Sequence, residues 1–75
     1  MNLDERRFLK IIGERLRQRR LELKWTQADL ARKCDLHRTF IGSVERGERN
    51  VSILNLRLIA RVLRVALSDL MRELA

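Results

Sequence analysis

Hydrophobic side chains recur along most of this chain at spacings of three and four residues, which is the period of an amphipathic helix. The pattern predicts a first helix from about Leu3 to Leu23, because Asn2 and Glu5 stand in capping-box positions at its start. It also predicts a fourth helix from Ser52 to about Leu63 and a fifth from Ser68 to the end of the chain. We therefore expect an all-α protein.

A second helix is predicted in the stretch that follows the first. Thr26 can accept a hydrogen bond from the free backbone N–H groups of a first helical turn, and Asp29 stands three residues later, where a capping box needs an acid. This helix is therefore expected to begin at Gln27. Its apolar pattern ends near Cys34, because Asp35 interrupts it.

A third helix follows after a short interruption. Ile41 and Val44 resume a spacing of three residues, and Gly47 can close the helix as a left-handed cap. Two short helices joined by a tight turn, over about residues 27–46, form a helix-turn-helix motif. Since the chain has no proline and only three glycines, no flexible linker divides it, and we expect a single domain over residues 1–75.

The charge of the chain points to an anionic partner. Lys and Arg total 17 against 10 Asp and Glu, for a formal net charge of +7, and most of the 17 are arginines. The planar guanidinium group suits phosphate groups and guanine edges. Such a balance can also describe a merely solvated surface, but the helix-turn-helix motif favours nucleic acid.

The sequence of the motif resembles that of a known family. The chain is similar to the phage-repressor and Cro-type (XRE-like) helix-turn-helix proteins over about residues 8–70, and most resembles the controller proteins of restriction-modification systems. The segments that carry the resemblance are WTQADLA at residues 25–31, HRTFIGSVERGERN at residues 37–50 and SILNL at residues 52–56. The resemblance implies a compact five-helix, lambda-repressor-like fold.

The same resemblance implies a function. A controller protein is expected to be a transcriptional regulator that binds double-stranded DNA at a palindromic operator as a homodimer. It would regulate its own gene and a restriction endonuclease gene. Prophage-type repressors and the antitoxins of toxin-antitoxin pairs share much of this sequence pattern, so both are alternative functions for this chain.

The family's docking geometry selects candidate DNA-binding residues, because the second helix of the motif enters the major groove with its first turn at the base edges. Arg38 is expected to make a bidentate contact with guanine, Thr39 to meet a base edge or thymine methyl, and Ser43 to make a weaker polar contact. The candidates for phosphate contacts are Gln27, His37, Arg46, Arg49 and Asn50. Arg49 could instead enter the minor groove, and His37 could instead serve the start of the helix.

A buried ion pair is also predicted. The inward stripe of the first helix passes through Arg19 or Arg20, and a buried arginine needs a carboxylate. In the family, an arginine six residues before the capping threonine pairs with a glutamate at the end of the recognition helix. Those positions here are Arg20 and Glu45. The alternative is that Arg20 extends to solvent.

The last two helices predict a dimer. In the helix from Ser52, residues 53, 56, 59, 60 and 63 form one apolar stripe, and a second stripe lies on a different side. Either this helix is buried nearly all round, or the second stripe and the apolar end of the chain are half of a homodimer interface, in a dimerisation region of about residues 52–75. The predicted interface residues are Leu54, Leu58, Val62, Leu67, Leu70, Met71 and Leu74.

The chain offers little material for catalysis. An enzyme would need a nucleophile with a base, or a metal cluster, and the sequence suggests neither. One cysteine and one histidine cannot form an internal disulfide or a tetrahedral zinc site. We therefore predict no enzymatic activity, no metal and no cofactor, and we expect Cys34 to be a small core residue rather than a redox sensor.

Location and further partners follow from similar considerations. No signal-peptide pattern opens the chain and no apolar run approaches the length that spans a bilayer, so we expect a cytoplasmic protein without membrane contact. RNA polymerase is a further candidate partner, because some relatives activate transcription through acidic residues on the helix that begins at Gln27. Here that face carries Ala28, Asp29, Arg32 and Lys33, which argues against direct activation.

Overall fold

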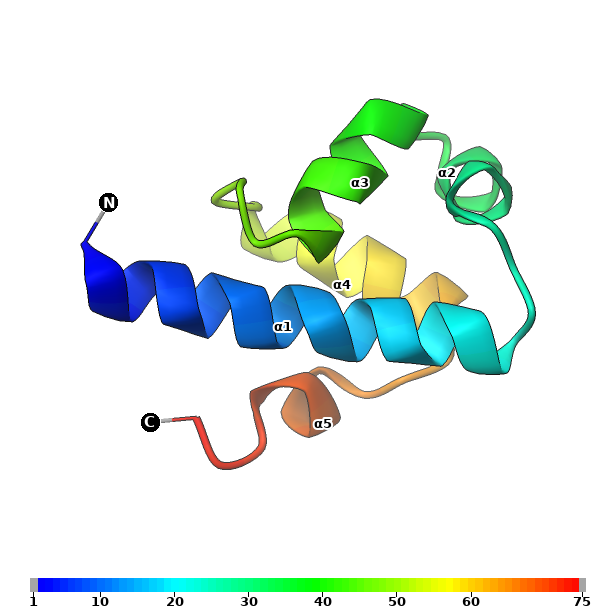
Figure 1. Cartoon of the computed structure of the whole chain (residues 1–75). Coiled ribbons are helices and arrows are strands. Elements are labelled where there is room, and N and C mark those ends of the chain that lie inside the picture. Colours follow the sequence, from blue (N-terminus) through cyan, green and yellow to red (C-terminus); the bar gives the residue numbers. More distant parts are fainter. Residues whose placement is uncertain (1, 75) are drawn as a thin grey trace.

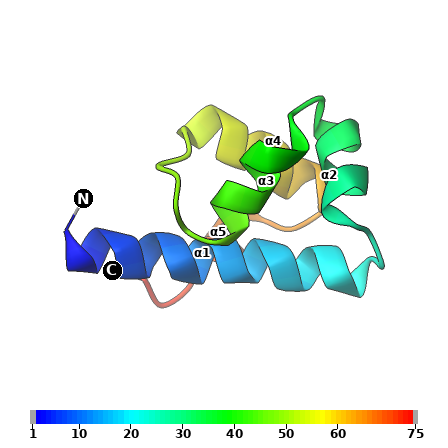
Figure 2. The same ribbon diagram turned by 45° about the horizontal axis from the view of Figure 1, so that its top comes forward.

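A computed structural model describes residues 2–74 and contains five helices in this range (Figure 1). The prediction of an all-α, five-helix fold is confirmed. The long helix α1 runs along the whole molecule and packs against α3 and α5, whereas α2 packs against α3 and α4 (Figures 1 and 2). The bounds are α1 (Leu3–Glu22), α2 (Gln27–Cys34), α3 (Arg38–Glu45), α4 (Ile53–Val62) and α5 (Leu67–Met71).

Local hydrogen bonds explain where three of the helices begin. The side chain of Asn2 accepts from the backbone N–H of Glu5 at 2.8 Å, and Thr26 Oγ1 accepts from the N–H of Asp29 at 3.0 Å. Both predicted capping boxes are present, because each acidic side chain also accepts from the N–H of its capping partner. Ser52 caps α4 in the same way. These helix starts are as the sequence predicts.

The helix ends agree less closely. Gly47 has φ +72°, so the predicted left-handed turn after α3 is confirmed. The predicted fifth helix is wrong in its extent: it begins at Leu67 rather than Ser68 and ends at Met71, with Glu73 in the left-handed region. Tertiary contacts decide this end, since side chains of α1 bind the carbonyl groups there. Position 75, the predicted last residue of the helix, lies outside the described residues.

A single apolar cluster between the helices forms the core. Leu70 of α5 is 1% exposed and belongs to this cluster, which corrects its predicted place in a dimer interface. The correction has a simple cause: α5 lies against α1 and buries Leu70 within its own chain. Cys34 is also buried, and burial raises the pKa of its thiol, as suits a core residue. The largest fully buried side chains are Ile12, Leu16, Leu30, Ile41, Ile59, Leu63 and Leu70.

Two glycines let α3 end directly on α1. A Cβ atom on Gly13 would collide with the carbonyl oxygen of Val44 and would lie 2.5 Å from that of Glu45. A Cβ atom on Gly47 would lie 2.6 Å from the Cα atom of Lys10. Because these neighbours are backbone atoms, they cannot rotate away. The C-terminal end of α3 therefore packs directly on the backbone of α1 at Gly13 and Lys10, a contact that we call the glycine seat.

Candidate nucleic-acid interface

The first turn of α3 is exposed at the surface and begins at a histidine cap. His37 Nδ1 accepts from the backbone N–H of Thr39 at 3.1 Å and lies 2.7 Å from the Thr39 hydroxyl oxygen. His37 thus occupies the helix-start position that the sequence analysis left as an alternative to phosphate binding. Arg38 and Thr39 are both exposed. The two side chains chosen to read bases therefore stand next to each other at an accessible helix start.

Further along α3, the side chain of Arg49 contacts Ser43, the residue predicted to make a weaker polar contact with DNA. Ser43 Oγ donates to the carbonyl oxygen of Phe40 at 2.7 Å and accepts from Arg49 Nε at 3.1 Å. The Arg49 guanidinium also lies over the Phe40 ring, 5.0 Å from its centroid. This pairing is a cation–π contact on the surface. In this state Arg49 belongs to the outer face of α3 together with Ser43.

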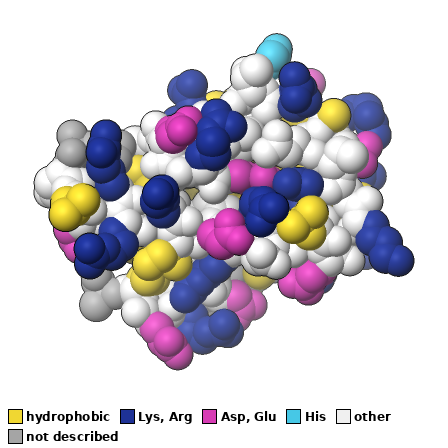
Figure 3. Space-filling view, in the orientation of Figure 1, with side chains coloured by type: hydrophobic (Ala, Val, Ile, Leu, Met, Phe, Trp, Pro, Cys, Tyr) yellow, Lys and Arg dark blue, Asp and Glu magenta, His cyan; other side chains and the backbone are white. Residues whose placement is uncertain are grey.

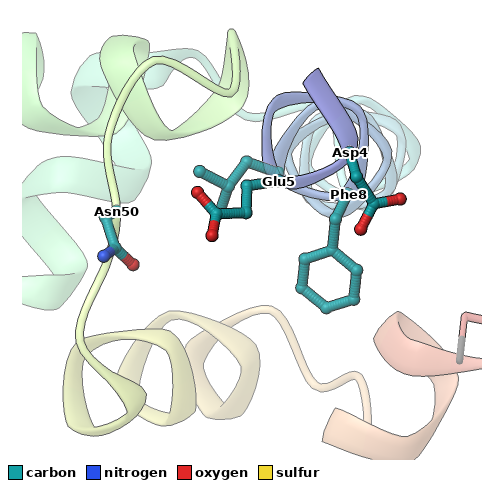
Figure 4. Close-up of a pocket in the computed structure, with 5 residues that line it drawn as sticks. Asp4, Glu5, Phe8 and Asn50 are labelled. Carbon is teal, nitrogen blue, oxygen red and sulfur yellow. The ribbon is translucent and has the colours of Figure 1, made fainter. Parts of the chain in front are cut away.

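The other predicted contacts lie at the edges of this face. Arg46 is exposed and its Nε donates to Glu48 Oε1 at 2.9 Å. Asn50 is exposed and lines a shallow pocket against the first turns of α1, opposite Glu5 and Phe8 (Figure 4). The structure therefore places Asn50 beside the start of α1 rather than beside Arg38.

Beneath the exposed face, the predicted partners Arg20 and Glu45 lie together in a bidentate pair. Arg20 Nε is 2.7 Å from Glu45 Oε2, and Arg20 Nη2 is 3.0 Å from Glu45 Oε1. Their exposed fractions are only 7% and 6%. The hydrogen bond that Arg20 donates to Glu45 raises the pKa of Arg20 against the opposing effect of burial. The pair joins α1 to the last turn of α3.

Two further groups complete this buried network. Arg20 Nη1 donates to the carbonyl oxygen of Trp25 at 2.7 Å, and Gln27 Nε2 donates to Glu45 Oε1 at 3.0 Å. Gln27 is the first residue of α2, so the network links α1, α2 and α3 at one point. One amide hydrogen of Gln27 is already used by Glu45. The amide has a second hydrogen, and the N–H groups of the first turn of α2 form a further anion-binding group.

Two other arginines of α1 have structural roles that the sequence does not reveal. Arg19 Nε donates to the carbonyl oxygen of Leu63 at the end of α4 at 2.8 Å. Arg15 Nη1 donates to the carbonyl oxygen of Leu70 in α5 at 3.0 Å and to that of Arg72, directly after α5, at 2.8 Å. Arg15 and Arg19 are four residues apart on one face of α1, which is the only signal the sequence holds for this role. Their partners lie more than forty residues away, so local patterns do not reveal them.

The part of the chain that the structure describes holds no group of three or more His, Cys, Asp or Glu side chains that could bind a metal ion. Within the same residues, no helix combines the length and the apolar character needed to cross a membrane. Lys and Arg side chains are instead spread over much of the face that α1 and α3 form (Figure 3).

Comparison with known proteins agrees with this geometry. Residues 16–70 match the helix-turn-helix family HTH_3. Control protein C.BamHI of Bacillus amyloliquefaciens is 45% identical over 62 residues, which cover 81% of this chain and 76% of that protein. The crystal structure of the restriction-modification controller protein C.AhdI from Aeromonas hydrophila superposes with a TM-score of 0.79 at 39% identity, covering 83% of this chain and 94% of the other.

The structure of another controller protein has been solved in complex with DNA. The C.Esp1396I tetramer in complex with its natural 35 base-pair operator superposes with a TM-score of 0.77 at 38% identity, covering 85% of this chain and 84% of the other. These likenesses extend over most of both chains and include the motif of α2 and α3. The chain therefore belongs to the helix-turn-helix family of DNA-binding regulators and, within it, to the controller proteins of restriction-modification systems.

Proposed function

We propose that this chain binds double-stranded DNA at a palindromic operator as a homodimer and thereby regulates its own gene and a restriction endonuclease gene. The observation that carries the proposal is the exposed first turn of α3, with Arg38 and Thr39 side by side on a helix whose far end is locked by the Arg20–Glu45 pair. A rigid helix with exposed polar side chains at its N-terminal turn suits the major groove. The operator complex of the relative C.Esp1396I supports this assignment.

Each residue then has a role in the complex. Arg38 would donate two hydrogen bonds to a guanine edge, and Thr39 would contact the neighbouring base. Gln27 would contact a phosphate at the start of α2 through its second amide hydrogen and its backbone N–H. Arg46 and Arg49 would exchange their present contacts with Glu48 and Ser43 for phosphates. Asn50 and His37 would stand at the edge of the contact.

Replacing Arg38 with alanine tests base recognition. We expect Arg38→Ala to weaken operator binding by about 1–3 kcal/mol for each subunit, because each subunit loses a bidentate base contact. Thermal unfolding should not change, since the side chain is exposed. Gel-shift titrations of a fragment carrying the native operator measure the effect. Arg72→Ala is the matched control, because it removes one exposed arginine next to α5, on the other side of α1. Equal losses for the two variants would contradict a base-reading role for Arg38.

Exposed apolar side chains on α4 support the homodimer. Leu54 is 67% exposed, and Leu58 and Val62, which follow it at helical spacing, are half-buried. Three side chains at and after α5 are also half-buried, and a small domain gains stability by covering exposed apolar side chains with a second copy. The interface that we propose consists of Leu54, Leu58, Val62, Leu67, Met71 and Leu74.

A charge on this surface should separate the two subunits. We expect Leu54→Glu to weaken self-association by at least tenfold, and operator binding to weaken with it, because the dimer and the DNA complex are linked by mass action. Sedimentation velocity over a range of protein concentrations measures the change. Leu21→Glu is the matched control, since Leu21 is also an exposed leucine (43%), lies near the C-terminal end of α1, and is not part of the proposed interface. Wild-type protein that stays monomeric at high micromolar concentration would refute the interface.

The acid on α2 favours regulation by occupancy of the operator. Asp29 accepts from the backbone N–H of Thr26 and from Arg32, and the bond to the Thr26 backbone is the main reason why the pKa of Asp29 is lowered. Its carboxylate is thus engaged within the chain, which counts against RNA polymerase as a direct partner through this face. A regulator of this kind would act in the cytoplasm, where the DNA is.

A further inference from the structure

A groove of about 570 Å³ lies between the first turns of α1 and the turn that follows α3. Cationic side chains dominate its lining: Arg6, Arg7 and Lys10 come from α1, and Arg46 comes from the end of α3. Glu48 is the only acid among the residues that line it. We call this feature the α1 groove, and it is lined by Leu3, Arg6, Arg7, Lys10, Arg46, Gly47 and Glu48.

Most of the positive charge of the α1 groove has no acidic partner among residues 2–74. Glu48 is paired with Arg46 at 2.9 Å. Arg6, Arg7 and Lys10 make no ion pair with any residue between 2 and 74. The acids of the first turn of α1 do not supply one, because Asp4 and Glu5 line a different pocket, beside Asn50 (Figure 4). Three free cations therefore line one wall of the groove.

The α1 groove is continuous with the proposed DNA contact. Lys10 and Arg46 line both this groove and a neighbouring one that reaches Gln27 at the start of α2. Gly47 packs directly against the backbone of Lys10, and this contact lies where the two grooves meet. Arg6 and Lys10 are four residues apart and so share one side of α1. The neighbouring groove is also lined by Glu14, Arg17, Glu45 and Glu48, and its arginines pair with Glu14 and Glu48. The unpaired cations therefore begin at Lys10, where the two grooves meet, and continue along α1 through the α1 groove.

We propose that the α1 groove binds DNA phosphates that lie next to those contacted by α2 and α3. The proposal rests on the proposed DNA-binding function and adds a sequence-independent contact surface to it. A row of free cations leading away from the recognition helix matches the row of charges along a DNA strand, and the groove contains no base-reading amide or hydroxyl group. Arg6, Arg7 and Lys10 lie outside residues 16–70, the part of the chain that matches the family.

The salt dependence of DNA binding tests the proposal. We expect the triple variant Arg6→Gln, Arg7→Gln, Lys10→Gln to flatten the plot of log affinity against log salt by roughly 3–5 per dimer, since each phosphate contact contributes about 0.9 to the slope. Affinity at about 0.1 M salt should fall at least tenfold. The loss should be equal for operator and random DNA, because phosphate contacts carry no sequence information.

A charge-matched variant controls for net charge. Lys33→Gln, Arg64→Gln, Arg72→Gln also removes three cations, all outside the α1 groove, and should change the slope by less than one. The conservative variant Arg6→Lys, Arg7→Lys should keep the wild-type slope. Circular dichroism and thermal melts of all variants show whether each is folded; a misfolded triple variant would be replaced by the single changes, whose effects on the slope should each be about one third.

The outcomes separate the two proposals. A wild-type protein whose DNA binding has no salt dependence would refute the proposed function itself. Wild-type binding that is steep in salt, with an equal slope for the α1 groove variant, would refute the α1 groove alone. A loss confined to operator DNA would also refute it, because that result would indicate base contacts.

Discussion

Glu45→Ala should lower the free energy of unfolding by about 3–5 kcal/mol, because it leaves the Arg20 guanidinium buried without its carboxylate. The loss includes the hydrogen bond from Gln27 to the same carboxylate. Urea melts of wild type and variant measure it. The change removes the link between α1, α2 and the end of α3, so operator affinity should fall as well, even though Glu45 itself is buried.

Glu48→Ala is the matched control for this loss. Glu48 also pairs with an arginine at short distance, but the side chains of Glu48 and Arg46 are 59% and 58% exposed. Solvent screens such a pair, and its removal should cost less than about 1 kcal/mol. The double variant Arg20→Met, Glu45→Leu should recover most of the stability that Glu45→Ala loses, since it buries no charge. Small and additive effects of the Arg20 and Glu45 changes would contradict a coupled buried pair.

Gly13→Ala should be the second severe change. An alanine normally stabilises a helix relative to glycine by about 1 kcal/mol, yet here we expect a loss of about 3 kcal/mol. The added methyl group would meet the carbonyl oxygens of Val44 and Glu45, so α3 would have to move away from α1. Thermal or urea unfolding of the variant measures the loss.

Gly42→Ala is the control at a second helical glycine. A Cβ atom there would approach only the ends of two flexible side chains, at 3.1 Å from Arg46 Nη1 and 3.4 Å from Gln27 Oε1. Both can shift, so this variant should be as stable as wild type or more stable by up to about 1 kcal/mol. Equal effects of the Gly13 and Gly42 changes would show that the crossing of α1 and α3 is not tight.

These two predictions concern the same joint. The glycine seat and the buried ion pair both fix the C-terminal end of α3 on α1, while the N-terminal end of α3 carries Arg38 at the surface. A base contact needs a side chain held in one orientation, since misplaced donors cannot form a bidentate pair. We therefore expect changes at Gly13 or Glu45 to reduce operator specificity in any protein that remains folded.

The elements that can be predicted from the sequence are those with local causes. The starts of α1, α2 and α4 follow from hydrogen bonds between residues three apart, at Asn2, Thr26 and Ser52. The turn at Gly47 follows from the ease with which glycine takes a positive φ. Such interactions can be read from a short stretch of chain. The expectation of an Arg20–Glu45 pair came from the family resemblance rather than from spacing.

The features that join distant segments depend on how the helices pack and could not be predicted from the sequence. Leu70 belongs to the core because α1 packs over it. The helix α5 ends at Met71, where Arg15 of α1 binds the carbonyl groups of Leu70 and Arg72. The same holds for the bond between Gln27 and Glu45 and for the gathering of cations in the α1 groove. Apolar or basic side chains show the same spacing in the sequence whether they contact the core of their own chain, a second subunit or DNA. What it meets depends on how the helices cross, and that is settled by packing over the whole chain.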